Sequence, residues 1–142
     1  MNVSDRPHSG LELHLPRRRL WQGVFLVLTL IPLVSAALAL AVGIERFVDA
    51  DEVDVALDST YRYMGGVYLA LALLVFWAVP RIEARVDAVV FVAGAIFLGG
   101  IGRLLSIAAH GAPGAYTWYV LIIELGVLPL SLFLRRQVTT SS

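Results

Sequence analysis

The sequence predicts an all-α fold: an integral membrane bundle of four transmembrane helices that forms a single domain over residues 1–142. Composition is the first observation, because 58% of the residues are hydrophobic, 15% are charged and the mean hydropathy is +0.79. Soluble domains lie nearer half apolar and a quarter charged. The second observation is a set of four long apolar stretches separated by charged residues. None of them alternates apolar and polar residues as a membrane strand does, so helices are expected.

The first predicted span covers about residues 20–44, a stretch without a charged side chain. As a helix it would be about 37 Å long, which exceeds the ~30 Å hydrocarbon core of a bilayer. A cleaved signal peptide is the competing interpretation, with Arg17 to Arg19 as its basic start. The apolar run is longer than the usual stretch of about 7–15 residues, so we expect a retained anchor. Residues 1–16 are predicted to form a cytoplasmic arm.

The other predicted spans cover about residues 61–79, 86–109 and 116–134. Ser59 and Thr60 are candidate caps for the second helix. The turn between the third and fourth spans has about six residues, which favours antiparallel neighbours. Close backbone approach holds membrane helices together, so small residues at helical spacing predict contact faces. These residues are Ser35, Ala39 and Gly43 in the first span, Gly66 and Ala70 in the second, and Ala95, Gly99 and Gly102 in the third.

Arginine placement predicts the orientation. The clusters Arg17 to Arg19, Arg81 with Arg85, and Arg135 with Arg136 fall on one side of a four-span chain. The positive-inside rule makes that side cytoplasmic, and the loop of residues 45–58 on the other side is rich in acid. All eleven basic residues are arginine, a bias typical of a GC-rich bacterial genome. We therefore expect a multi-pass protein of the bacterial plasma (inner) membrane with both termini in the cytoplasm.

Two charges interrupt the apolar stretches, Arg103 in the third span and Glu124 in the fourth. At 1.5 Å per residue they would lie about 9 Å and about 12 Å below the same membrane surface. A lone charge at such depth costs ~2.5–3.5 kcal/mol on insertion scales, so we expect the two side chains to meet. The guanidinium fork of arginine matches a carboxylate in a bidentate pair.

Further polar groups are expected on the same side of the membrane. Asp58 and Arg62 have the four-residue spacing of a helical ion pair, and His110 lies seven residues beyond Arg103. One hypothesis is that these three residues and the Arg103–Glu124 pair rim an outward-facing pocket for a ligand or a proton. The alternative is that the pair only fixes the register of the helices, while Arg62 reaches lipid headgroups. The sequence leaves both open.

Catalytic and cofactor signatures are missing from the sequence. It contains no cysteine, no G-x-S-x-G, no H-E-x-x-H and no phosphate-binding loop. The three histidines, His8, His14 and His110, are scattered too widely to predict a zinc or haem site. No metal and no cofactor is therefore expected. The net charge of zero argues against nucleic acid as a partner.

Two sequence blocks resemble the bacterial domain of unknown function 4345, a group of small four-helix membrane proteins. The first is DSTYRYMGG from Asp58 to Gly66, and the second is FLGGIGRLLS from Phe97 to Ser106. Gly111-Ala112-Pro113 and then Glu124 extend the likeness, which covers roughly residues 20–134. The resemblance implies that Arg62, Arg103 and Glu124 belong to a core shared by the family. It implies no activity, substrate or cofactor.

The sequence thus favours a small, non-enzymatic accessory or assembly subunit of a larger membrane complex. The alternative is a binder or carrier of a small amphiphilic or anionic ligand around Arg62, Arg103 and Glu124. An intramembrane acid–base enzyme using Glu124 and His110 ranks last. The expected partners are membrane lipid and either a larger membrane protein complex or further copies of the chain.

Overall fold

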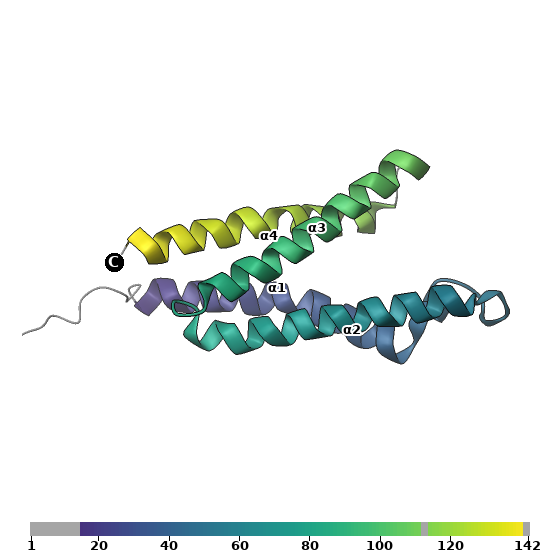
Figure 1. Cartoon of the computed structure of the whole chain (residues 1–142), viewed down its shortest axis with the longest axis horizontal. Helices are drawn as coiled ribbons and strands as arrows, with labels where there is room; N and C mark the ends of the chain where they lie inside the picture. The colour runs from purple at the N-terminus through teal and green to yellow at the C-terminus, as the bar shows by residue number, and fades with distance from the viewer. Residues whose placement is uncertain (1–14, 112–113, 141–142) are drawn as a thin grey trace, which may run out of the picture. The chain divides into compact units, whose positions relative to one another are not determined.

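The computed structural model of the chain describes residues 15–111 and 114–140. The described residues are all-α, with four long helices: α1 (Leu15–Ala41), α2 (Val55–Ala78), α3 (Val86–His110) and α4 (Ala115–Thr140) (Figure 1). Three short 3₁₀ helices, η1 (Gly43–Arg46), η2 (Ala50–Glu52) and η3 (Val79–Arg81), lie in the connections. Each long helix, α2 together with η3, provides a stretch of 24 to 27 residues that is long and apolar enough to cross a membrane.

The helix ends differ from the predicted span limits, because a helix begins and ends where its backbone groups are capped and not where an apolar run begins and ends. α2 begins at Val55, six residues before the predicted span, and its N-cap is Asp54, whose carboxylate accepts a 2.9 Å bond from Leu57 N–H. Ser59 and Thr60 lie inside the helix, so their prediction as caps is wrong. α1 begins at Leu15, within the predicted arm, and the arm's residues 1–14 lie outside the described residues.

Packing divides the chain into two compact units, residues 22–80 and residues 81–142 together with the start of α1 up to Trp21. In the first unit α1 and α2 form an antiparallel hairpin. A Cβ on Gly65 of α2 would lie 2.8 Å from the Cβ of Ala39 and 3.3 Å from the carbonyl of Ala36, so the two helix backbones approach closely there. Ala39 was predicted to lie on a contact face, but its partner is Gly65 and not Gly66, which has open space around it.

In the second unit α3 and α4 form another antiparallel hairpin (Figure 1). α4 buries one stripe of side chains at helical spacing: Leu121, Glu124, Val127, Ser131, Leu134 and Val138. The buried part of α3 is concentrated in its first half, where Val89, Val92 and Ala93 are 1% to 2% exposed. The close approach to α4 occurs at Gly100, whereas Gly102 of the predicted contact stripe has nothing near it. Most of the core of this unit therefore lies between the first half of α3 and the part of α4 that follows Glu124, and Leu121 extends the buried stripe of α4 on the other side of Glu124.

The start of α1 is fixed to the end of α4 in the same unit. Trp21 Nε1–H donates to Gln137 Oε1 over 3.1 Å, and the indole lies 6.1 Å from the ring of Phe133. An exposed ion pair of 2.9 Å joins Arg135 of α4 to Asp87 in the first turn of α3. Three segments distant in the sequence thus meet at one end of this unit.

Candidate functional site

Arg103 of α3 and Glu124 of α4 form a bidentate ion pair. Arg103 Nε–H donates to Glu124 Oε2 over 2.9 Å, and Nη2–H donates to Oε1 over 3.0 Å. The parallel geometry matches both oxygens of the carboxylate to two donors of the fork, which is the strongest form of this interaction. The two residues that were expected to meet are therefore in contact. Their use as a ligand site stays a prediction.

Local sequence explains why Glu124 fits against α3. Residue 100 on the facing helix is glycine, and a Cβ there would lie 3.1 Å from Glu124 Cβ and 3.2 Å from Leu125 Cδ2. The missing side chain lets the stem of Glu124 lie on the backbone of α3. Arg103 is three residues further along α3, so its guanidinium lies beside the carboxylate. Gly100 is the residue of this site that sequence reasoning missed. Gly99 and Gly100 are adjacent in the sequence, and nothing in the sequence indicates which of them faces the partner helix.

The two partners differ in exposure. The side chain of Glu124 is 8% exposed and that of Arg103 is 39% exposed. The carboxylate is therefore the enclosed charge, and the arginine covers it from the outside. A buried carboxylate needs such a partner because an unpaired charge in apolar surroundings costs several kcal/mol.

Asp58 and Arg62 form the second ion pair, with Arg62 Nε–H 2.7 Å from Asp58 Oδ2 on one face of α2. The pair does more than link two turns of one helix. Arg62 Nη1–H donates to the carbonyl of Leu40 over 2.6 Å, and Nη2–H donates to that of Val42 over 3.3 Å. Asp58 Oδ1 accepts the N–H of Ile44 over 2.8 Å. Together the two side chains satisfy backbone groups at the end of α1, which a helix leaves without intrahelical partners.

Gly43 makes this arrangement possible. Its φ is +70°, the left-handed conformation that often ends a helix and favours glycine. A Cβ at this position would collide with Asp58 Oδ1 and with the guanidinium of Arg62. The ion pair therefore occupies the space that any other residue would fill. Gly43 was predicted to lie on a contact face within the first span, but α1 ends at Ala41 and Gly43 lies beyond it. A glycine just after an apolar run is the signal that could have indicated this helix end.

The other end of the α1–α2 hairpin has a matching contact that the sequence did not indicate. Gln22 of α1 donates through Nε2 to the carbonyl of Val79 over 3.0 Å and to that of Pro80 over 3.4 Å, at the end of α2. Each helix thus supplies a side chain that caps the C-terminal end of the other. Because a helix end leaves its last carbonyls without intrahelical partners, such capping stabilises both helix ends.

His110 lies at the last turn of α3, where its Nδ1 is 3.2 Å from the carbonyl of Ser106 on the same helix. This contact directs the ring along its own helix, and the bidentate bonds of Glu124 go to Arg103 alone. Asp58 and Arg62 belong to the unit of residues 22–80, and Arg103, His110 and Glu124 belong to the other. The single outward pocket rimmed by all five residues stays a prediction.

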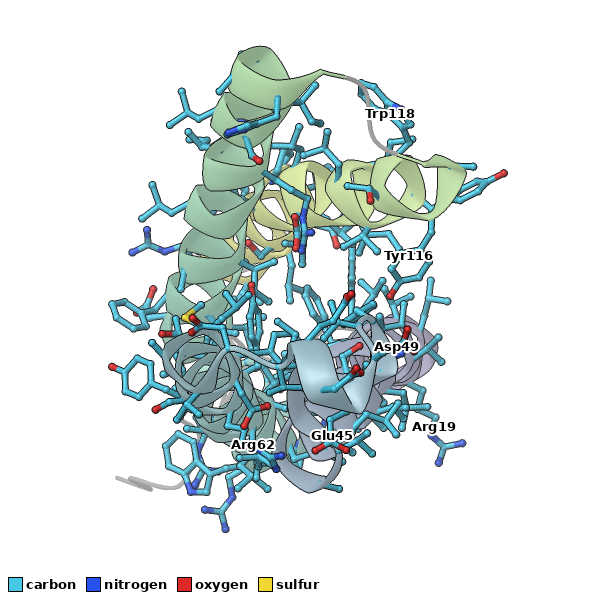
Figure 2. All side chains as sticks on the ribbon, turned by 90° about the vertical axis from the view of Figure 1, so that its right-hand side faces the viewer. Arg19, Glu45, Asp49, Arg62, Tyr116 and Trp118 are labelled. Carbon is cyan, nitrogen blue, oxygen red and sulfur yellow. The ribbon has the colours of Figure 1, made fainter. Side chains whose placement is uncertain are left out.

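Glu45, Asp49 and Arg62 lie at the loop end of the α1–α2 hairpin, whereas Tyr116 and Trp118 lie at the start of α4 (Figure 2).

Within residues 15–111 and 114–140, no three His, Cys, Asp or Glu side chains gather as a candidate metal site. The chemistry that the described side chains supply is ion pairing and the capping of helix ends.

Comparison with known proteins identifies a family for this chain but no individual similar protein. Neither the curated proteins nor the solved structures contain a match to the chain. A family model described as "Domain of unknown function (DUF4345)" matches residues 20–135, a range that includes both ion pairs. The likeness seen in the two sequence blocks is thereby confirmed, and the chain belongs to the DUF4345 family.

Proposed function

We propose that the chain is a multi-pass protein of the bacterial plasma membrane with both termini in the cytoplasm, and that it is a non-enzymatic accessory or assembly subunit of a larger membrane complex. Four helices of sufficient length and apolarity support the membrane location. The arginine clusters at residues 17–19, 81–85 and 135–136 support the orientation.

One observation carries the accessory role: Asp58, Arg62, Arg103 and Glu124 are bonded to one another or to a helix end. Arg62 and Asp58 bond to the backbone at the end of α1, and Arg103 bonds to Glu124 between α3 and α4. These contacts fix two helical hairpins. A small protein built around such contacts offers rigid apolar surfaces to neighbouring membrane helices, which is what an assembly subunit requires.

A ligand binder is the second candidate, and the exposure of Arg103 favours it. The arginine side chain is 39% exposed, although its carboxylate partner is enclosed. The two bonds to Glu124 hold the guanidinium in place while part of the side chain stays exposed. An anionic headgroup approaching from the exposed side would meet a positive charge held in a fixed position.

The orientation can be tested by cysteine labelling, because the natural sequence contains no cysteine. Single substitutions Asp51→Cys, in the acidic loop, and Ser142→Cys, at the C-terminus, report on opposite sides of the membrane. With a membrane-impermeant maleimide on intact cells, we expect labelling of Asp51→Cys alone. Ser142→Cys should react only after permeabilisation. Labelling of Ser142→Cys in intact cells would overturn the proposed orientation.

The accessory role can be tested by native mass spectrometry of the full chain, gently solubilised from its own membrane. We expect a protein complex of fixed stoichiometry that survives size-exclusion chromatography, without a retained small molecule. Arg103→Leu and Glu124→Gln are compared with Leu105→Ala, a control on the same stretch of α3 whose wild-type side chain is 67% exposed. A small mass bound to the wild type and to the control, but lost from both site variants while they remain helical, would replace the accessory role with ligand binding.

A further inference from the structure

The arginines of the described residues concentrate at one end of the unit that contains α3 and α4. Arg18 and Arg19 come from the start of α1, Arg81 and Arg85 precede α3, and Arg135 and Arg136 follow the apolar part of α4. The contacts of Trp21 with Gln137 and of Asp87 with Arg135 bring these three segments together. The cluster is therefore a product of the fold as well as of the sequence.

The charge of this end is strongly positive. This end contains six arginines with described side chains and two carboxylates, Glu83 and Asp87. Asp87 is already paired with Arg135. Arg19, Arg81, Arg135 and Arg136 are exposed, and the side chain of Arg19 extends away from its helix (Figure 2). Like charges held together at a surface need counter-ions, so this end favours an anionic partner.

Apolar side chains lie directly beside the arginines. Leu20 follows Arg19 and is 63% exposed, and Phe133 lies two residues before Arg135 and is 54% exposed. Trp21 packs against Phe133 with its N–H satisfied by Gln137, so its ring lies at the border between the charged and apolar zones. A soluble anion or a nucleic acid would use the charges and leave these apolar groups in water. A lipid uses both zones.

We propose that this arginine cluster is a binding site for anionic phospholipids, with the headgroup phosphate between arginines of different segments and the acyl chains along the apolar surface beside them. Guanidinium forks pair with phosphate oxygens in bidentate fashion, as Arg103 does with Glu124. Basic sites between helices at the cytoplasmic surface are a known means of binding such headgroups. The inference rests on the proposed membrane location.

The test is competition between two lipids for the purified full chain. The protein in mild detergent is mixed with equal amounts of phosphatidylglycerol and phosphatidylcholine with the same acyl chains, and retained lipid is counted by native mass spectrometry. We expect the wild type to retain phosphatidylglycerol preferentially. Each arginine near an anionic headgroup contributes about a fivefold preference, so Arg19→Gln with Arg81→Gln should reduce the preference about 25-fold.

Arg46→Gln is the matched control, because Arg46 is an exposed arginine that belongs to the acidic loop between α1 and α2. It should keep the wild-type preference. Equal retention of the two lipids by the wild type, or an unchanged preference in the double variant, would overturn the inference. A loss of about fivefold in Arg46→Gln would overturn it too, because each removed charge would then count equally and the effect would follow net charge and not the cluster.

Membrane extraction separates this result from failure of the proposed location. If alkaline carbonate releases the wild-type chain from membranes, the location is wrong and the lipid site is rejected with it. If the chain stays in the membrane and shows no preference between the lipids, only the lipid site is rejected. Circular dichroism of the double variant checks that a lost preference is not a lost fold.

Discussion

Replacing Arg103 with leucine is expected to destabilise the protein by about 3 kcal/mol, which is the lower end of the cost of breaking a buried ion pair. The substitution removes both donors to Glu124, whose side chain is only 8% exposed, and leaves an enclosed carboxylate without its partner. Insertion scales give a similar cost of ~2.5–3.5 kcal/mol for one charge in an apolar span. Leu105→Ala, at an exposed position two residues away, should change the unfolding free energy by no more than about 0.5 kcal/mol.

The reverse substitution is expected to cost less. Glu124→Leu leaves Arg103 without its carboxylate, but that side chain is 39% exposed and long enough to move its charge toward the membrane surface. We expect a loss of about 1–2 kcal/mol for this variant. The double variant Arg103→Leu/Glu124→Leu leaves no charge unpaired and should cost less than Arg103→Leu alone.

The measurement is the free energy of unfolding in mixed micelles, followed by circular dichroism as a denaturing detergent is added. All four proteins form a double-mutant cycle, and we expect a coupling energy of at least about 1.5 kcal/mol between the two positions. Simple addition of the two single changes in the double variant would refute an energetic coupling between Arg103 and Glu124. Equal destabilisation by Glu124→Leu and Arg103→Leu would show that the difference in exposure between the two side chains has no energetic consequence.

Three further predictions use the same unfolding measurement. Gly43→Ala should destabilise by at least about 1–2 kcal/mol because the residue is left-handed and its Cβ would collide with the neighbouring ion pair, whereas Gly23→Ala, with open space around it, should not. Gly100→Val should cost about 1–3 kcal/mol through overpacking against α4, and Gly102→Val should be tolerated; equal effects would contradict the packing. Gln22→Ala should cost about 0.5–1.5 kcal/mol for each lost bond to the end of α2, and no loss would show that this cap contributes nothing.

The helices were largely predictable because a membrane span is a simple physical requirement. Apolar length between charges located all four, and the predicted third span, residues 86–109, differs from α3 (Val86–His110) by one residue. The errors occurred where the helix and the apolar run end at different residues: α1 ends before the run does, whereas the start of α2 and the end of α4 extend beyond it. There the helix boundary depends on capping by residues such as Asp54, whose N-cap role can be read from the sequence only when the register is known.

The two ion pairs were predictable to different degrees. Asp58 and Arg62 are four residues apart on one helix, and Arg103 and Glu124 lie at one depth on antiparallel neighbours, so both pairings follow from spacing and from the cost of a lone charge. The bonds of Arg62 to the carbonyls of Leu40 and Val42 did not follow. They join residues about twenty positions apart through a backbone conformation at Gly43 that spacing alone does not specify.

The sequence by itself determined that this chain forms four membrane-length helices and that each intramembrane charge needs a partner, because composition and charge spacing set the cost of leaving them alone. Only the tertiary structure decided which faces meet. In a membrane-spanning bundle, side chains facing lipid and side chains facing a neighbouring helix are equally apolar, so a hydrophobic pattern does not fix the rotation of each helix. The close contact at Gly65, and not at Gly66, sets how α2 faces α1. The close contact at Gly100, and not at Gly102, sets how α3 faces α4 and places Glu124 beside Arg103.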